Sequence, residues 1–176
     1  HSMIERRVAG LAVIVSEMNQ ETIDEIVRAR LPVVIYDVGP PGPNITNIRV
    51  LYEIGMRRMV QYLYTLGHRR LALVCHDSSL APIQARRESF IDCARQHGLD
   101  ILFKVAGKED SPAGGMQAVH ELLSGGFRPT AIVCVNDYMA IGAMRAVLSH
   151  GWSVPRDVSI SGFDNIDFSA FTNPPL

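Results

Sequence analysis

Residues 129–176 read PTAIVCVNDYMAIGAMRAVLSHGWSVPRDVSISGFDNIDFSAFTNPPL, and this stretch decides the fold class. An apolar run over 131–135 ends in Asn136, and a second apolar run over 158–161 is followed by Asp164. Ligands of parallel α/β sheets bind outside the carboxyl ends of the strands. Two strands that both finish in polar side chains therefore predict one binding crevice, suited to a ligand with hydroxyl groups.

The rest of the chain alternates short apolar runs with amphipathic stretches. Continuous apolar runs of this length are typical of strands buried on both faces of a parallel sheet. Strands are expected at 8–15, 33–36, 71–75, 101–105, 131–135 and 158–161, and helices near 20–30, 51–66, 82–97, 112–124 and 138–150. The pattern predicts an α/β protein built on parallel sheets.

Polar residues at the helix starts indicate N-caps. Asn19, Ser111 and Asp137 have the residue types that accept a hydrogen bond from the first turn of a helix. Asn136 could also serve as a cap, but we assign the cap to Asp137 and a ligand contact to Asn136. Residues 38–47, VGPPGPNITN, are expected to form a surface loop because proline and glycine disfavour both helix and central strand.

Composition excludes several classes of protein. The chain has 176 residues, is 47% hydrophobic and carries a net charge of −1, so no basic face for nucleic acid is expected. No apolar run is long enough to span a membrane. The three cysteines follow no disulfide or metal-site spacing and are expected to be free thiols, which favours a cytoplasmic location. No metal and no cofactor is expected, and no nucleotide-binding or nucleophile-elbow motif indicates an enzyme.

The chain resembles the effector-binding domain of bacterial transcriptional regulators of the lactose-repressor type, the LacI/GalR family. The resemblance covers almost the whole chain and rests on RVAGLAVI, LPVVIYDV, YLYTLGHRRLALV, PTAIVCVNDYMAIGAMRAV, GWSVPRDVSISGFDN and PPL. It implies a periplasmic-binding-protein-like fold of type I, in which two doubly wound lobes enclose a small effector. Residues 1–69 would form part of the N-terminal lobe, 70–163 the C-terminal lobe, and 164–176 the start of the return crossover to the first lobe. The chain is expected to be truncated at both ends, without the helix-turn-helix and with an incomplete first lobe.

The resemblance also implies an effector site. The family pattern R-x-x-G-F reads Arg86-Arg87-Glu88-Ser89-Phe90 here, so Arg86 is the matching arginine, although serine in place of glycine leaves Arg87 as an alternative. The asparagine of the family's ND pair matches Asn136, and the aspartate of GFD matches Asp164. Arginine presents a rigid fork of donors, aspartate accepts hydroxyl hydrogens and asparagine does both. Further candidate contacts are Phe163, Ser16 and Ser78.

These observations predict an effector-sensing domain that binds a sugar-like or purine-like ligand and alters the affinity of a regulator for operator DNA. The full-length protein is expected to be a homodimer, with the helix near 51–66 close to the interface because of its tyrosines. A periplasmic sugar-binding protein of a transport system, which has the same fold, is the alternative. An enzyme is the less favoured reading.

Overall fold

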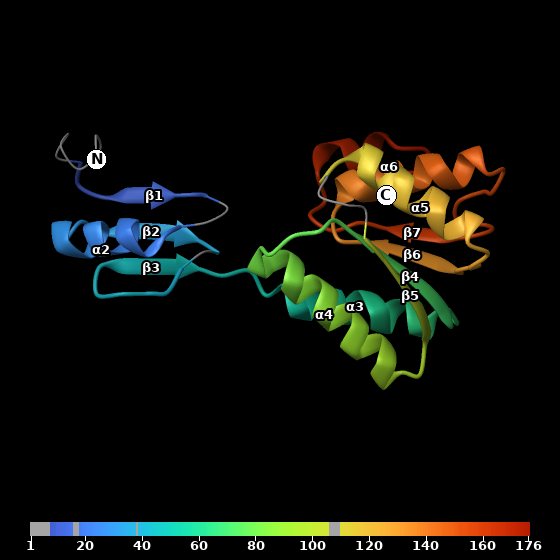
Figure 1. Ribbon diagram of the computed structural model, residues 1–176, viewed down its shortest axis with the longest axis horizontal. Coiled ribbons are helices and arrows are strands. Elements are labelled where there is room, and N and C mark those ends of the chain that lie inside the picture. The colour runs from blue at the N-terminus through green and yellow to red at the C-terminus, as the bar shows by residue number, and fades with distance from the viewer. Residues whose placement is uncertain (1–7, 16–17, 38, 106–109) are drawn as a thin grey trace. The chain divides into compact units, whose positions relative to one another are not determined.

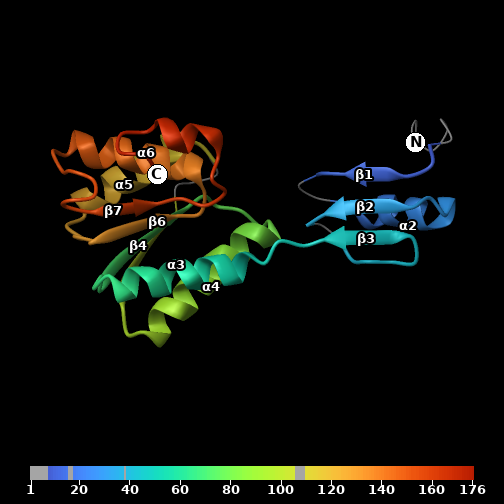
Figure 2. The same ribbon diagram turned by 180° about the vertical axis from the view of Figure 1, so that it is seen from behind.

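The computed structural model describes residues 8–15, 18–37, 39–105 and 110–176, and it divides the chain into two compact units, 1–51 and 52–176. Figures 1 and 2 show both units. The α/β class with parallel sheets is confirmed. The division lies earlier than the lobe boundary predicted between residues 69 and 70. The difference arises because α3 (Tyr52–Thr65) buries Met56, Val60 and Leu63 in the core of the second unit.

The first unit contains a three-stranded parallel sheet in the order β1 (Leu11–Val13), β2 (Val33–Tyr36), β3 (Ile45–Ile48). One helix, α2 (Gln20–Ala29), packs against it, and their shared core consists of Ile23, Ile26, Val33, Ile35 and Ile45. The expected cap is present: the side chain of Asn19 accepts a hydrogen bond from the Thr22 backbone N–H over 2.9 Å. The first strand is shorter than its apolar run over 8–15 suggested.

The loop predicted over 38–47 is wrong at its end, where β3 begins at Ile45. The prolines and glycines stop at Pro43, and Ile45 is buried in the first core. The Asn44 side chain donates to the carbonyl oxygens of Ile26 and Leu31 and so holds the start of β3 in place. β3 lies at the edge of the described sheet, where one side of the strand needs no ladder partner.

The second unit is a four-stranded parallel sheet with helices on both faces. The strand order is β5 (Asp100–Val105), β4 (Arg70–Cys75), β6 (Ala131–Cys134), β7 (Ser159–Ser161). Helix α3 packs beside α4 (Ala81–Gln96) on one face, and α5 (Pro112–Ser124) packs beside α6 (Asp137–Ser149) on the other (Figure 1). This arrangement confirms the predicted doubly wound sheet.

The interior of the second sheet is apolar throughout. β4 and β6 lie at its centre, and the residues Leu71–Cys75 and Ala131–Val135 are fully or almost fully buried, as their continuous apolar runs predicted. Gly67, Gly98 and Gly151 follow helices with positive φ angles of 90°, 63° and 78°, a backbone conformation that glycine adopts without strain. Residues 164–176 belong to this unit, and the 3₁₀ helix η1 spans Asp167–Phe171.

Two glycines bring α5 and α6 unusually close together. A Cβ added at Gly115 would overlap the main chain of Met139, and one added at Gly142 would overlap the main chain of Pro112. Only glycine permits this approach. As a result, the first turn of α5 lies beside the N-terminal half of α6.

Candidate functional site

The direction of winding in the second sheet reverses between β4 and β6. The chain passes from β4 to β5 on one side and then crosses back to β6 on the other, so the helices that follow β4 and β6 cover opposite faces. In open α/β sheets, such a switch point leaves a crevice at the carboxyl ends of the two strands. His76 directly follows β4, and Asn136 lies two residues after the end of β6. Asp164 lies just beyond β7, the next strand along.

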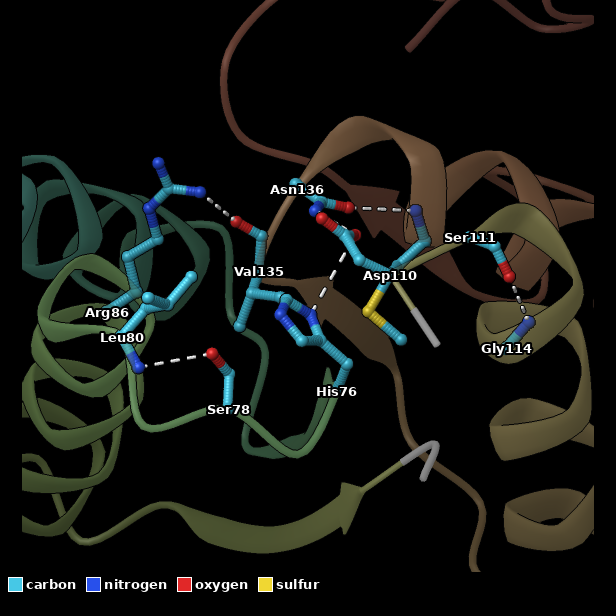
Figure 3. Close-up of polar contacts among 10 residues, drawn as sticks. His76, Ser78, Leu80, Arg86, Asp110, Ser111, Gly114, Val135 and Asn136 are labelled. Atoms are coloured by element: carbon cyan, nitrogen blue, oxygen red, sulfur yellow. Dashed lines mark hydrogen bonds and ion pairs between the residues drawn. The ribbon is translucent and has the colours of Figure 1, made fainter. Parts of the chain in front are cut away.

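Arg86 reaches this edge of the sheet from α4. Its side chain is 6% exposed, and Nη1 donates to the carbonyl oxygen of Val135 over 2.7 Å (Figure 3). Nη2 donates to Oδ1 of Asp164 over 2.9 Å. Nε is buried and has no hydrogen-bond partner among the described residues. The guanidinium therefore joins the end of β6 to the loop after β7, and its Nε–H is left without a partner.

Two aromatic rings hold the Arg86 guanidinium. Its central carbon lies 4.4 Å from the ring centroid of Tyr52 and 4.3 Å from that of Phe163. Contacts of this kind stabilise a cation, and more so when it is shielded from water. The neighbouring Arg87 instead bonds to Gln84 and lies over the ring of Phe103. Arg86 is thus the inward residue of the pair, despite the serine at position 89.

Asp164 lies in a strained turn, and its side chain is 39% exposed. Its φ angle is 101° and that of Asn165 is 54°, both in a region that residues other than glycine rarely adopt. Burial raises the pKa of the Asp164 carboxyl above its ordinary value, while the Arg86 guanidinium acts in the opposite direction. The negative charges of Asp137 and Asp110 add to the upward shift of this pKa. The Asp164 carboxyl therefore interacts with one positive charge, that of Arg86, and with two negative charges, those of Asp137 and Asp110.

The cap of α6 is Asn136, so the prediction that Asp137 caps this helix is wrong. Oδ1 of Asn136 accepts from the Met139 backbone N–H over 3.0 Å. The Asp137 carboxylate instead accepts from the Ile166 backbone N–H over 2.8 Å and lies against Gly162, where a Cβ would overlap it. Asp137 is 4% exposed and ties the loop after β7 to the start of α6.

Capping occupies only one end of the Asn136 amide. Its Nδ2 donates to Oδ1 of Asp110 over 2.5 Å (Figure 3). Asp110 precedes Ser111, which caps α5 by accepting from the Gly114 backbone N–H over 3.1 Å, as predicted. The same oxygen of Asp110 lies 3.8 Å from Nδ1 of His76. The contacts form two groups, Arg86 with Asp164 and Asn136 with Asp110 and His76. They meet at the end of β6, where Arg86 bonds to the carbonyl oxygen of Val135, the residue before Asn136.

The sequence-based prediction missed His76 and Asp110. His76 follows the strand sequence LALVC as Asn136 follows AIVCV, so the rule that found Asn136 could have found it too. It is 7% exposed, and its Nδ1 has no hydrogen-bond partner among the described residues. Asp110 gave no comparable signal, because its place depends on the close approach of α5 and α6.

The remaining candidate residues have different positions. Phe163 flanks Arg86, as described above. Ser78 lies in the turn before α4, where its hydroxyl accepts from the Leu80 backbone N–H over 3.2 Å. This bond gives Ser78 a local structural role. Ser16 lies outside the described residues.

Two further properties bear on the chemistry of the site. Within the described ranges, no three His, Cys, Asp or Glu side chains gather closely enough to hold a metal ion. None of the helices described combines the length and apolarity that a membrane span requires.

The fold and the site can be compared with those of known proteins. The model of the periplasmic binding protein-like domain family matches residues 60–176. The transcriptional repressor PurR of Pasteurella multocida is 32% identical over 99% of this chain and 53% of its own length. The probable transcriptional repressor ExuR of Bacillus subtilis is 34% identical over 92% of this chain and 49% of its own length. The chain therefore spans about half the length of these relatives.

Among solved structures, the Lac repressor dimer bound to operator and an anti-inducer is similar to the chain. It superposes with a TM-score of 0.85 and 29% identity over all of this chain and 61% of the repressor chain. These proteins are transcriptional repressors rather than enzymes. The chain belongs to the periplasmic binding protein-like domain family and is homologous to the PurR and ExuR repressors and the Lac repressor.

Proposed function

We propose that this chain is the effector-sensing domain of a bacterial transcriptional regulator, and that Arg86, Asn136 and Asp164 bind a small sugar-like or purine-like effector. The observation that carries the proposal is the contact between Arg86 and Asp164 beside the switch point of the second sheet. Open α/β sheets bind their ligands at this place. The homology to repressors supports the regulatory role.

The site can read a neutral, hydroxyl-bearing ligand. Arg86 keeps a free Nε donor, and Asp164 keeps lone pairs that Arg86 does not use. The rings of Tyr52 and Phe163 beside the guanidinium offer flat apolar surfaces. A wrong ligand would leave buried polar groups unpaired, at a cost of about 1–3 kcal/mol for each. Specificity then follows from the fixed positions of these groups.

Effector binding would act on DNA affinity through a shift between two states. A ligand can bias such an equilibrium only by the difference in its affinity for the two states. In the full-length protein, operator DNA would be bound by a helix-turn-helix outside this chain.

Cys75, Cys93 and Cys134 are all free and buried, which supports a cytoplasmic location and weighs against the periplasmic sugar-binding alternative.

We also propose that the full-length protein is a homodimer whose interface includes η1. Phe168 and Phe171 are 70% and 83% exposed. They border an apolar hollow of about 410 Å³ that is also lined by Pro112, Tyr138, Ile141 and Thr172. Exposed apolar patches of this kind mark interaction surfaces. A second copy is the expected occupant, since the similar Lac repressor forms a dimer.

The tyrosines of α3, which led us to expect the interface near this helix, mostly pack within the protomer. Tyr52 packs beside Arg86, and Tyr64 stacks on His97 with ring centroids 4.6 Å apart. Tyr62 is 61% exposed, so it is the tyrosine of this helix that could still contact a partner.

A thermal-shift screen of neutral sugars, nucleobases, nucleosides, uronates and sugar phosphates tests the effector-sensing role. Ligand that binds only the native state stabilises it by about 2.7 kcal/mol at a concentration 100 times Kd, so a true effector raises Tm measurably. A hit should lose its effect in the Asp164→Asn variant and should change operator binding by the full-length protein. A screen without a hit, or a hit without effect on operator affinity, would contradict the proposal.

A further inference from the structure

A second pair of polar side chains lies beside Arg86 and Asp164 at the edge of the second sheet. His76 is more than nine-tenths buried, and its Nδ1 has no hydrogen-bond partner among the described residues. Asp110 lies 3.8 Å from this nitrogen and is 48% exposed, so its carboxylate can still meet a ligand. Asn136 donates to Asp110 while its Oδ1 caps α6, and Arg86 bonds to the carbonyl oxygen of the preceding residue, Val135.

The charges around this edge do not balance. Three carboxylates, those of Asp110, Asp137 and Asp164, act on the same region, since the first two raise the pKa of the third. Arg86 supplies one positive charge, and its Nη2 is already engaged by Asp164. A protonated His76 would still leave the balance at −1. Arg87 and Asp77, whose charges act on the neighbouring Cys75, add one charge of each sign.

We propose that His76 and Asp110 form a second polar subsite next to Arg86 and Asp164, and that the two aspartates select a neutral or cationic ligand over an anionic one. This inference rests on the proposed function of the same crevice. The ligand would place hydroxyl or amine hydrogens on the Asp110 carboxylate and one polar group on the imidazole of His76. A sugar, an amino sugar or a nucleobase fits this chemistry, whereas a uronate or a sugar phosphate does not.

The physical reason is repulsion between like charges at this edge, where Arg86 and His76 are buried and the two aspartates are partly exposed. Like charges repel strongly where burial reduces screening by water. A carboxylate or phosphate group would have to displace Asp164 from Arg86 and then lie beside Asp110. A hydroxyl group faces no such repulsion, and the unused nitrogen of His76 gains a partner that it lacks in the free protein.

Inorganic phosphate is the first probe, at low ionic strength so that salt does not mask the charges. Wild type should show no saturable phosphate binding at millimolar concentration in a calorimetric or ³¹P NMR titration. The double variant Asp110→Asn, Asp164→Asn leaves Arg86 without its carboxylates and should gain phosphate affinity by at least about tenfold. Asp92→Asn, which removes an exposed carboxylate elsewhere on α4, should gain none.

Matched ligand pairs are the second probe: galactose with galacturonate, ribose with ribose 5-phosphate, and glucose with glucosamine. In each pair that binds, the neutral or amine member should bind at least about tenfold more tightly than the anion, and Asp110→Asn should reduce that ratio. His76→Phe, which fills similar space without ring nitrogens, should weaken the neutral member.

Two results would overturn the inference: tight binding of phosphate or of an anionic ligand by wild type, or no gain of phosphate binding in the folded double variant. Far-UV circular dichroism establishes that the variants are folded. Failure of the proposed function gives a different result: no ligand, neutral or charged, then stabilises wild type. The phosphate titrations of wild type and the double variant still measure the effect of the two aspartates.

Discussion

Arg86 and Asp164 are 78 positions apart in the sequence, yet Nη2 of Arg86 donates to Oδ1 of Asp164 over 2.9 Å. The pair links α4 to the strained turn after β7, and Phe163 packs against the same guanidinium. A hydrogen-bonded ion pair at the carboxyl edge of the sheet presents fixed donors and acceptors without rearrangement. This fixed geometry supports the proposal that the pair recognises a ligand.

The Asp164→Asn substitution should lower effector affinity by about 30-fold to 1000-fold, equivalent to roughly 2–4 kcal/mol. The amide keeps the size of the side chain but can present a donor where the ligand also presents a donor. Calorimetric titration with the effector found in the screen measures the loss. Asp167→Asn, an exposed carboxylate three residues further on, is the matched control. Unchanged affinity in a folded Asp164→Asn protein would make Asp164 a turn residue only.

The Arg86→Lys substitution should destabilise the protein by about 2–4 kcal/mol, whereas Arg87→Lys should be nearly neutral. An ammonium cannot reach both the Val135 carbonyl and the Asp164 carboxylate in the geometry of the planar guanidinium. Urea unfolding measures both changes. Equal stability of the two variants would show that the buried contacts of Arg86 contribute little to folding.

The three thiols should resist modification in the native protein. Burial raises the pKa of the Cys75 thiol from its usual 9.0 to about 11 and shifts those of Cys93 and Cys134 in the same direction. Ellman's reagent should therefore react slowly at pH 8 with folded protein and rapidly with three thiols after unfolding. Fast reaction of any cysteine without unfolding would contradict the buried positions.

The same shift predicts how stability depends on pH. A thiol whose pKa is higher in the folded state favours folding below the unfolded pKa, and this contribution disappears as pH rises through the folded pKa. For Cys75 the loss falls between about pH 9 and pH 11. Cys75→Ala should reduce the fall in Tm across this window, compared with wild type in the same buffers.

The Phe171→Glu substitution should dissociate the proposed homodimer of the full-length protein at micromolar concentration. The side chain is 83% exposed, so the change should leave the fold of the protomer nearly unaltered, within about 0.5 kcal/mol. Sedimentation velocity measures the dissociation. Tyr62→Glu on α3 is the comparison, and dissociation by this variant alone would place the interface on α3 instead.

Most of the fold followed from short-range patterns. The apolar runs Leu71–Cys75 and Ala131–Val135 are the central strands because a strand covered on both faces needs apolar residues at every position. Asn19 and Ser111 cap helices because a short polar side chain can reach the free backbone N–H groups of the first turn. Two predictions were wrong because neighbouring residues fitted the same local pattern. Asn136 rather than Asp137 caps α6, and β3 begins at Ile45, inside the segment predicted as a loop.

The sequence by itself determined the α/β class with parallel sheets and the positions of Asn136 and Asp164 after the ends of two strands. Those features depend on burial and on spacing along the chain, which the order of residues contains. Only the tertiary structure decided that Arg86 rather than Arg87 is buried, that Asn136 caps α6, and that His76 meets Asp110. These outcomes depend on distances between segments far apart in sequence, and packing, such as the close approach of α5 and α6 at their glycines, sets those distances.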